Sequence, residues 1–282
     1  MIQTWKEGVE YTFRTRHKWR VGSGARTSRI NCNHVTRIIG EDFLLADVNR
    51  SVLREIEFAC EDYGHSDATI NRVLGAFSTV LHHCVDDEVA DFVVPRIPKR
   101  TENQGRPNWF TREQIDLICE RENSIGMADV VRFAVMTGGR QGELLKLCVK
   151  DIDLDGGLVY FGGRPEFNTK TGDWRTVPIV EPIREMLVRR CEGVPNDVPV
   201  FDEWHSAERL LRKFKQRVRD VGIEPQYVFH CLRHSFATWH VEAGTPIRVL
   251  MDLMGHKKIE TTLRYGKASD KARLEAMASF VG

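Results

Sequence analysis

Two arginines, two histidines, a lysine and a tyrosine in the second half of the chain have the side chains that chemistry on a phosphate requires. They are Arg140, Lys170, His230, Arg233, His256 and Tyr265. Guanidinium groups bind the oxygens of a phosphodiester bidentately and stabilise the charge that these oxygens gain during displacement. A lysine can protonate a leaving oxygen, and a tyrosine can attack as a covalent nucleophile. Each residue alone is more often a surface ion pair or a packing residue, so the prediction of phosphoryl transfer depends on their joint order.

A tyrosine nucleophile also needs help from its surroundings. A phenol with an unperturbed pKa of about 10 is ionised in only about one molecule in a thousand at pH 7. Tyr265 therefore requires a nearby proton acceptor or nearby cations.

A metal site is the alternative interpretation of the same segment. His230 and His234 stand at the i, i+4 spacing of ligands on a helix, and His240 and His256 follow. No acidic residue lies between the first pair, and Arg233 would place a fixed positive charge beside the ion. A zinc hydrolase is therefore the weaker hypothesis, and we expect no metal.

Other common chemistries have no support in the sequence. It contains no G-x-x-x-x-G-K-[ST] loop, and Gly22-Ser-Gly24 follows no predicted strand. It also lacks the G-x-S-x-G turn of many serine hydrolases. We therefore expect no nucleotide cofactor and no ATP requirement.

Helices and one small sheet must position the candidate residues. Thr111-Arg-Glu-Gln114 is a capping-box pattern that opens a helix. Further helices are predicted over 128–136, from about 141, over 181–191 and 204–221, and in most of the chain after Pro225. Apolar and β-branched residues predict strands at 158–161 and 176–180, with a turn at Thr171-Gly-Asp173 between them.

The first half reads as helical throughout. Helices are predicted over 4–19, 27–39, from 49 to about 62, and from a cap at Ser66-Asp67 onward. The proline-containing stretch VVPRIPKRTENQGRPNW then marks a linker. We expect a mainly α protein: a small all-α domain at 1–98, a linker at 99–107, and at 108–282 a mostly helical α+β domain with one small antiparallel sheet.

The distribution of charge indicates a polyanionic partner. The 282 residues carry 41 basic and 40 acidic side chains, yet the segment from Tyr11 to Gly40 contains no acidic residue. A one-signed segment of this kind is typical of nucleic-acid binding, although a solvated helix face would look the same. With the basic residues near the linker, the candidate DNA-binding set is Arg14, Arg16, Lys18, Arg20, Arg26, Arg29, Arg37, Arg96, Lys99, Arg100 and Arg106.

Composition narrows the cellular setting. Seven scattered cysteines without a C-x-x-C pair are typical of reduced thiols in a cytoplasm. No stretch reaches the roughly 18 apolar residues of a membrane helix, and the N-terminus does not resemble a secretion signal. We expect a cytoplasmic protein with no membrane partner.

The ordered motifs of the second half resemble the tyrosine recombinase family, which includes phage integrases and Xer-like recombinases. The resemblance is carried by Thr137-Gly-Gly-Arg140-Gln-Gly-Glu143-Leu144, Thr169-Lys170-Thr-Gly172, Arg175-Thr-Val-Pro-Ile179, His230-Cys-Leu-Arg233-His234-Ser-Phe-Ala-Thr238, Met254-Gly255-His256 and Tyr265. More weakly, 66–84 is similar to the last helix of the core-binding domain, and Trp109-Phe-Thr-Arg-Glu113 to the opening of the catalytic domain. Gly139, Met254 and Cys231 depart from residues common in the family, at positions without a proposed chemical role.

The resemblance implies a role for each candidate. Tyr265 attacks the scissile phosphate and leaves a 3′-phosphotyrosine and a free 5′-hydroxyl. Arg140, Arg233 and His256 hold the non-bridging oxygens, His230 accepts the proton of Tyr265, and Lys170 protonates the 5′-oxygen. Glu143 orients Arg140 or His230. Because the phosphotyrosine keeps the bond energy, rejoining needs neither ATP nor a metal.

It also implies partners. The two domains would clamp double-stranded DNA attachment sites, and four copies would assemble on two sites, with DNA-bending and excision accessory proteins. We expect phage or prophage integration and excision in a bacterial cell, where the bound protein associates with the nucleoid. About 98 residues leave no room for an arm-binding domain, so the chain is a two-domain recombinase or a piece of a longer one.

Three questions stay open at the level of sequence. A type IB topoisomerase-like enzyme would share the chemistry but relax any plasmid, and a DNA-binding regulator would have an inactive site. The spacing of apolar residues also predicts a helix at 270–280 that docks either on its own domain or on a neighbouring copy.

Overall fold

The computed structural model describes residues 1–22, 24–102, 107–120, 125–162, 174–265 and 277. The expected turn at 171–173, the candidates Lys170 and Arg106 and, apart from Met277, the helix expected at 270–280 lie outside these residues. The chain divides into two compact units, Met1–Gly105 and Arg106–Gly282. Among the described helices, none combines the length and the apolar character that crossing a bilayer requires.

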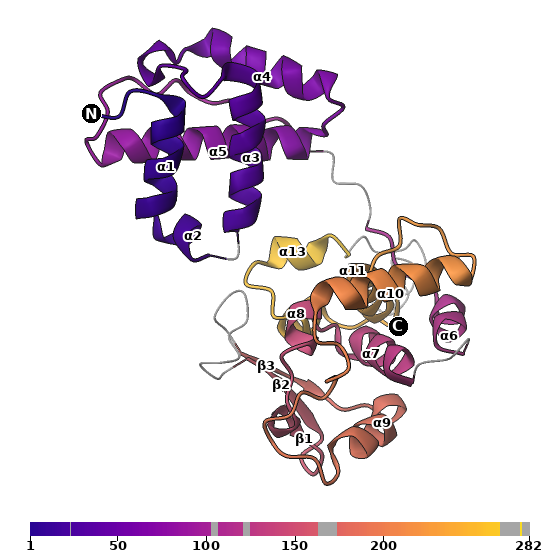
Figure 1. The fold of residues 1–282 in the computed structure, drawn as a ribbon. Helices are drawn as coiled ribbons and strands as arrows, with labels where there is room; N and C mark the ends of the chain where they lie inside the picture. The colour runs from indigo at the N-terminus through magenta and orange to yellow at the C-terminus, as the bar shows by residue number, and fades with distance from the viewer. Residues whose placement is uncertain (23, 103–106, 121–124, 163–173, 266–276, 278–282) are drawn as a thin grey trace. The chain divides into compact units, whose positions relative to one another are not determined.

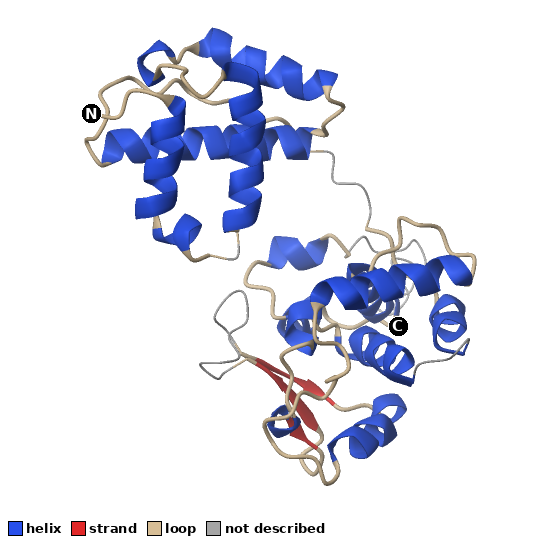
Figure 2. Ribbon diagram, in the orientation of Figure 1, coloured by secondary structure: helices blue, strands red, loops and turns tan. Residues whose placement is uncertain are grey.

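Unit 1 is helical (Figures 1 and 2). Its long helix α5 contacts α1, α3 and α4. The cap predicted at Ser66 is present, because its side chain accepts a hydrogen bond from the backbone N–H of Thr69. In addition, Asn49 accepts from the N–H groups of Ser51 and Val52. The elements of this unit are α1 (Trp5–Thr15), α2 (His17–Arg20), α3 (Ala25–Ile39), the 3₁₀ turn η1 (Leu45–Asp47), α4 (Arg50–Asp62) and α5 (Asp67–Asp86).

The helix predicted over 4–19 is broken at Arg16, whose backbone is extended (φ −76°, ψ 107°). The break lets α2 contact both α1 and α3. The ring of Trp19 is buried and lies against Phe13, with 4.8 Å between the ring centroids. Helical periodicity continues through 16–19, so the sequence gives no sign of the break. We attribute it to the burial of the indole, which offsets the interrupted backbone ladder.

Trp5 and Phe77 are the largest side chains at the centre of unit 1, and both are fully buried. Their ring centroids are 5.2 Å apart. The indole N–H of Trp5 donates to the Thr36 hydroxyl at 2.9 Å, so its polar atom has a partner inside the core. All seven cysteines of the chain are free thiols, and only Cys148, in unit 2, is not buried.

Unit 2 combines helices with a three-stranded antiparallel sheet of order β1-β2-β3, drawn in red in Figure 2. Val159 of β2 is paired with Val177 of β3, and both are buried. The elements are α6 (Arg112–Glu120), α7 (Ile125–Thr137), α8 (Gln141–Leu144), the 3₁₀ turn η2 (Val149–Asp151), β1 (Ile152–Asp153), β2 (Leu158–Phe161), β3 (Arg175–Pro178), α9 (Glu181–Cys191), α10 (Ala207–Asp220), α11 (His230–Glu242), α12 (Ile247–Met254) and α13 (Ile259–Leu263).

The apolar helix α7 is central to unit 2, where it contacts α6, α9 and α11. Its Phe133 is fully buried between Phe161 of β2 and Phe201, at centroid distances of 6.3 and 5.2 Å. The predicted capping box is also present: the backbone N–H of Gln114 donates to the Thr111 hydroxyl, and the backbone N–H of Thr111 donates to the side-chain Oε1 of Gln114. The mainly α class with one small antiparallel sheet is therefore confirmed.

Candidate active site

The first part of the site is the turn between α7 and α8. Gly138 has a positive φ of 62°, a conformation that favours glycine, and the chain then enters α8 at Arg140. The Arg140 guanidinium donates to Glu143 Oε1 at 2.7 Å, and its backbone N–H donates to Oε2 at 2.9 Å. A quarter of the Arg140 side chain is exposed, whereas Glu143 is buried. Glu143 therefore fixes the orientation of a partly exposed guanidinium.

Arg175 shares this carboxylate. Its Nη2 donates to Glu143 Oε2 at 2.7 Å, its Nε donates to the carbonyl of Leu253 at 2.9 Å, and its guanidinium lies 4.4 Å from the ring centroid of Phe161. Burial raises the pKa of Glu143, but the ion pair with Arg175 and the hydrogen bonds from Arg140 outweigh it and lower the pKa to about 2. The carboxylate is therefore ionised at neutral pH.

Arg233, on α11, is held by the main chain. It donates to the carbonyl oxygens of Gly138 at 2.5 Å and Met254 at 2.6 Å, and its side chain is buried. Burial and the charges of Arg140 and Arg175 lower its pKa to about 9, so it is still protonated at pH 7. Three guanidinium groups thus surround one carboxylate, and this surplus of positive charge suits an anionic substrate.

His256 follows the left-handed Gly255 that ends α12. Its Nδ1 lies 2.8 Å from the hydroxyl of the buried Thr262. Burial, together with the charges of Arg233, Arg140, Arg175 and Arg264, lowers the pKa of His256 to about 4. The imidazole is therefore neutral at pH 7. When Nδ1 accepts from Thr262, the proton is on Nε2, which leaves Nε2–H as a donor for a phosphate oxygen.

His230 lies in the first turn of α11 and is exposed. Partial desolvation lowers its pKa, and the charges of Arg233 and Arg140 lower it further. The ring of His230 makes an edge-to-face contact with that of His234, one turn along the helix, with centroids 4.7 Å apart.

Tyr265 packs against the small cluster of Phe236, Leu250 and Met254. Its hydroxyl lies 2.6 Å from Nδ1 of His234. Burial raises the pKa of Tyr265, although Arg233 and Arg264 oppose that effect. The phenol is therefore protonated at neutral pH, as the unperturbed value implies, and any attack by its oxygen would first require the loss of that proton.

A hollow of about 450 Å³ adjoins this group of side chains. It lies between the start of β3 and the end of α12, and its lining includes Trp174, Arg175, Gly255 and His256. The side chain of Trp174 is largely exposed at its edge. His256 and Arg175 thus border a space open to solvent.

The structure gathers five of the six catalytic candidates, together with Glu143, from α8, α11 and the segment that ends at Tyr265. Lys170 lies outside the described residues. Two further members, Arg175 and His234, were not given roles from the sequence. Arg175 stands two residues before the apolar Val177 on a strand, so the two side chains share a face, which is a sign of a charge that faces inward. The i, i+4 spacing of His230 and His234 predicted a shared helix face.

The described part of the chain contains no cluster of potential metal ligands that would support the metal hypothesis. No three His, Cys, Asp or Glu side chains converge there in a way that could hold an ion. One ring nitrogen of His234 contacts Tyr265, and one of His256 contacts Thr262.

The basic residues of unit 1 differ in solvent exposure and in whether they form ion pairs within the unit. Arg14, Lys18, Arg20, Arg26, Arg29, Arg37, Arg96 and Lys99 are exposed. Arg100 instead forms ion pairs with Glu57, Glu61 and Asp67, so its charge is already used within the unit. The others remain candidates for phosphate contacts, and those at 14–29 gather where α2 contacts α1 and α3.

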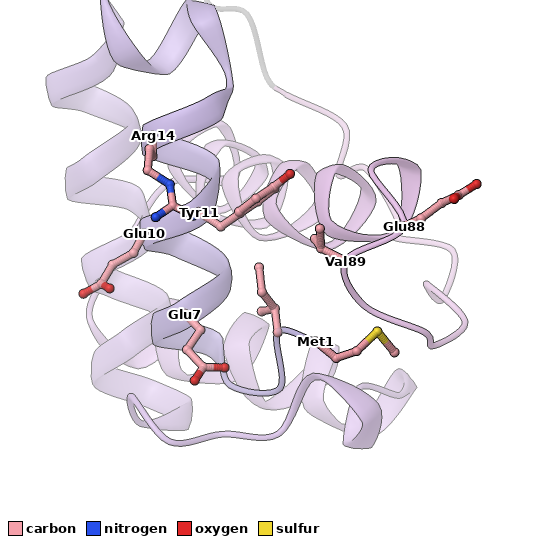
Figure 3. Close-up of a pocket in the computed structure, with 8 residues that line it drawn as sticks. Met1, Glu7, Glu10, Tyr11, Arg14, Glu88 and Val89 are labelled. Carbon is pink, nitrogen blue, oxygen red and sulfur yellow. The ribbon is translucent and has the colours of Figure 1, made fainter.

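A second hollow, of about 560 Å³, lies in unit 1 between α1 and the turn after α5 (Figure 3). Its lining includes Glu7, Glu10 and Glu88 but only one basic residue, Arg14. The negative surplus makes this hollow unsuited to a phosphate.

Sequence comparison identifies the family. Residues 108–272 match the model of the phage integrase family. The chain belongs to that family. The XerA tyrosine recombinase of Pyrococcus furiosus is 30% identical to it over 225 residues, which cover 76% of this chain and 74% of that protein. The XerA of Saccharolobus solfataricus is 35% identical over 136 residues, or 48% of this chain and 44% of that protein. The XerC of Pelobacter propionicus is 31% identical over 186 residues, or 61% and 58%.

Solved structures share the fold of this phage integrase family member. The Tn1549 transposon integrase in complex with transposon right end DNA superposes with a TM-score of 0.77 at 17% identity, over 99% of this chain and 100% of that one. A lambda integrase dimer bound to a core site gives 0.73 at 16% identity, over 95% of each chain. XerH bound to its difH substrate gives 0.69 at 22% identity, over 91% of this chain and 79% of that one.

Proposed function

We propose that the chain is a site-specific DNA recombinase that cleaves and rejoins DNA through a 3′-phosphotyrosine, and that it integrates and excises phage or prophage DNA. The observation that carries the proposal is the group of Arg140, Arg233 and His256, in which Arg233 also interacts with Tyr265. The group combines two positive charges and a neutral donor with a phenol, which is the set that a phosphodiester and its attacking nucleophile require.

In the proposed reaction, Tyr265 attacks the scissile phosphorus while Arg140, Arg233 and His256 hold the non-bridging oxygens. The bond to the 5′-oxygen breaks, and Lys170 supplies the proton that this oxygen needs. The phenolic proton passes to a histidine of α11: the family resemblance assigns His230, whereas His234 is the residue that contacts the hydroxyl. Because the phosphotyrosine conserves the bond energy, rejoining proceeds without ATP or a metal.

The proposed partner is a double-stranded attachment site. Unit 1 (the core-type DNA-binding domain expected at 1–98) and the linker at 99–107 supply phosphate contacts through the exposed basic residues, and the catalytic domain at 108–282 supplies the chemistry. The active assembly is a tetramer on two sites, aided by DNA-bending and excision accessory proteins. The free cysteines of the chain suit the reducing cytoplasm of a bacterial cell, where the DNA-bound protein would associate with the nucleoid.

The experiment that tests the proposal is covalent capture. The protein is incubated with sheared phage and host DNA in EDTA, quenched with detergent, and the protein-linked DNA is sequenced beside a Tyr265→Phe control. We expect an adduct with the wild type only. Captured sequences at a phage attachment site and its host insertion point support phage integration. Sequences confined to the host chromosome would contradict phage integration and indicate that the protein acts on a chromosomal site. An adduct that persists in Tyr265→Phe, or that needs a divalent metal, would overturn the mechanism.

A further inference from the structure

His234 is the titratable group that touches the proposed nucleophile. Its Nδ1 lies 2.6 Å from the Tyr265 hydroxyl, and the two rings lie at an angle of 45° with centroids 5.7 Å apart. A heavy-atom distance of 2.6 Å is within the range over which a base removes a proton directly. His230, one helical turn away, contacts the His234 ring.

We propose that His234 is a catalytic residue that receives the phenolic proton of Tyr265 during cleavage and returns it during rejoining. This inference rests on the proposed function. In cleavage, the O–H bond of Tyr265 breaks and an N–H bond forms at Nδ1 of His234, while the phenolic oxygen bonds to phosphorus and the 5′-oxygen leaves. In rejoining, a 5′-hydroxyl attacks phosphorus and returns to Lys170, the acid of the proposed reaction, the proton that it received in cleavage, while the departing phenolic oxygen regains its proton from His234.

The charges around His234 explain how DNA would switch this base on. The groups that face it are His230 and Arg233 on its own helix and Arg264 and Tyr265 beyond α13. Burial, together with the charges of His230, Arg233 and Arg264, lowers the pKa of His234 to about 4. A scissile phosphate bound by Arg233 brings a negative charge that opposes these cations, and this raises the pKa of His234. The nucleophile is therefore activated when its target is in place.

Packing supports a fixed geometry for the pair. His234 is half-buried on a helix whose neighbours Arg233 and Ser235 are both buried and hydrogen-bonded. Tyr265 packs against Phe236 of the same helix through the small cluster that includes Leu250 and Met254.

The test is the single-turnover rate of covalent adduct formation on a nicked duplex of the site recovered by the capture experiment. The variant is His234→Asn, because the Asn side-chain oxygen can accept the hydrogen bond where Nδ1 does but cannot take the proton. The matched control is His240→Asn on the same helix, whose ring contacts Thr245 and not Tyr265. We expect His234→Asn to slow the adduct by about 10²–10³-fold at pH 7, and His240→Asn to leave the rate unchanged.

If His234 acts as a base, the rate of adduct formation in the His234→Asn variant should depend on the acidity of the nucleophile. A fluorinated tyrosine at position 265 loses its proton more easily, so it should raise the rate of adduct formation by the His234→Asn variant at least tenfold. The rate of His234→Asn should also climb steadily with pH from 6 to 9. An unchanged or faster rate in His234→Asn, or a loss that the fluorinated tyrosine does not restore, would overturn the proposal. Absence of adduct from the wild type would instead contradict the proposed function.

Discussion

Glu143 is the single carboxylate that two guanidinium groups of the site share. Replacing it by glutamine keeps its shape but leaves Arg140 and Arg175 without their counter-charge. Breaking a buried ion pair by removing one partner costs about 3 kcal/mol or more. We expect Glu143→Gln to lower the free energy of unfolding of unit 2 by about that amount and to slow adduct formation, as measured by urea unfolding and covalent capture.

The control for this change is Glu41→Gln in unit 1. Glu41 pairs with Lys6 at 2.6 Å, but both side chains are more than half exposed. Exposed pairs contribute little because water and salt screen them. The variant should unfold as the wild type does, and equal losses in both variants would contradict the role given to burial at Glu143.

Two partly buried histidines predict how stability depends on pH. His234 and His256 have pKa values of about 4 in the folded protein, below the ordinary 6.5. Between pH 6.5 and pH 4 the unfolded chain therefore binds protons that the folded protein does not, so the free energy of unfolding falls as the pH falls. Because both rings are only partly buried, we expect a loss of about 2 kcal/mol from each by pH 4.

The measurement is urea unfolding of the wild type and of a His234→Asn/His256→Asn double variant at pH 8, 6 and 4. The double variant should lose less stability on acidification. Glu143, whose pKa is lowered from 4.5 to about 2, also begins to lose its contribution as the pH falls below about 4.5, but both proteins contain it, so this loss cancels in the comparison. A wild type as stable at pH 4 as at pH 8 would contradict the assignment.

Residue types and order were enough to name most of the side chains that the structure brings together in the candidate site. Arg140, Arg233, His256 and Tyr265 could be named from sequence because each lies in a distinctive local motif. Arg175 could not be given a role, because its partners Glu143 and Leu253 lie 32 and 78 residues away in the chain. His234 was singled out only for metal, because its contact with Tyr265 depends on how the chain returns after α13.

At the scale of elements, the turn between α7 and α8 positions both the start of α8 and the Gly138 carbonyl that accepts a hydrogen bond from Arg233. Gly138 combines a φ of 62° with a close approach to Phe236: an added Cβ would lie 2.5 Å from Cδ1 of that ring. Gly138→Ala must therefore shift either the ring or the turn. We expect it to destabilise unit 2 by at least about 2 kcal/mol and to slow adduct formation, measured by urea unfolding and capture.

Gly142, within α8, provides the matched control. An added Cβ there would meet nothing within 4 Å, and its backbone is helical. Gly142→Ala should be neutral or stabilise unit 2 by up to about 1 kcal/mol, because alanine favours the helix. Equal behaviour of the two alanine variants would show that the turn does not constrain the site.

Elements were predictable where local signals decide them. The caps at Ser66, Asn49 and Thr111 mark helix starts by short-range hydrogen bonds. The break at Arg16 was missed because burial of Trp19, a tertiary effect, decides it. Strand β1 was missed because two residues are too few to show alternation.

At the scale of the whole molecule, each unit has its own hydrophobic core. We therefore expect two unfolding transitions in calorimetry. Phe77→Ala in unit 1 and Phe133→Ala in unit 2 each remove a fully buried ring, at a cost of about 3–5 kcal/mol. Each variant should lower the midpoint of one transition and leave the other in place. A single transition that both variants shift equally would show that the units unfold together.

The distribution of cysteines has a practical consequence for labelling. Burial raises the pKa of the thiols of Cys32, Cys84 and Cys119 to between about 11 and 12, which keeps them unreactive at neutral pH. Cys60, Cys191 and Cys231 are buried as well, which leaves Cys148 as the one cysteine of the chain that solvent reaches. A maleimide dye should therefore attach to the native sequence at one position in unit 2, so that fluorescence can follow the protein onto DNA without any engineered residue.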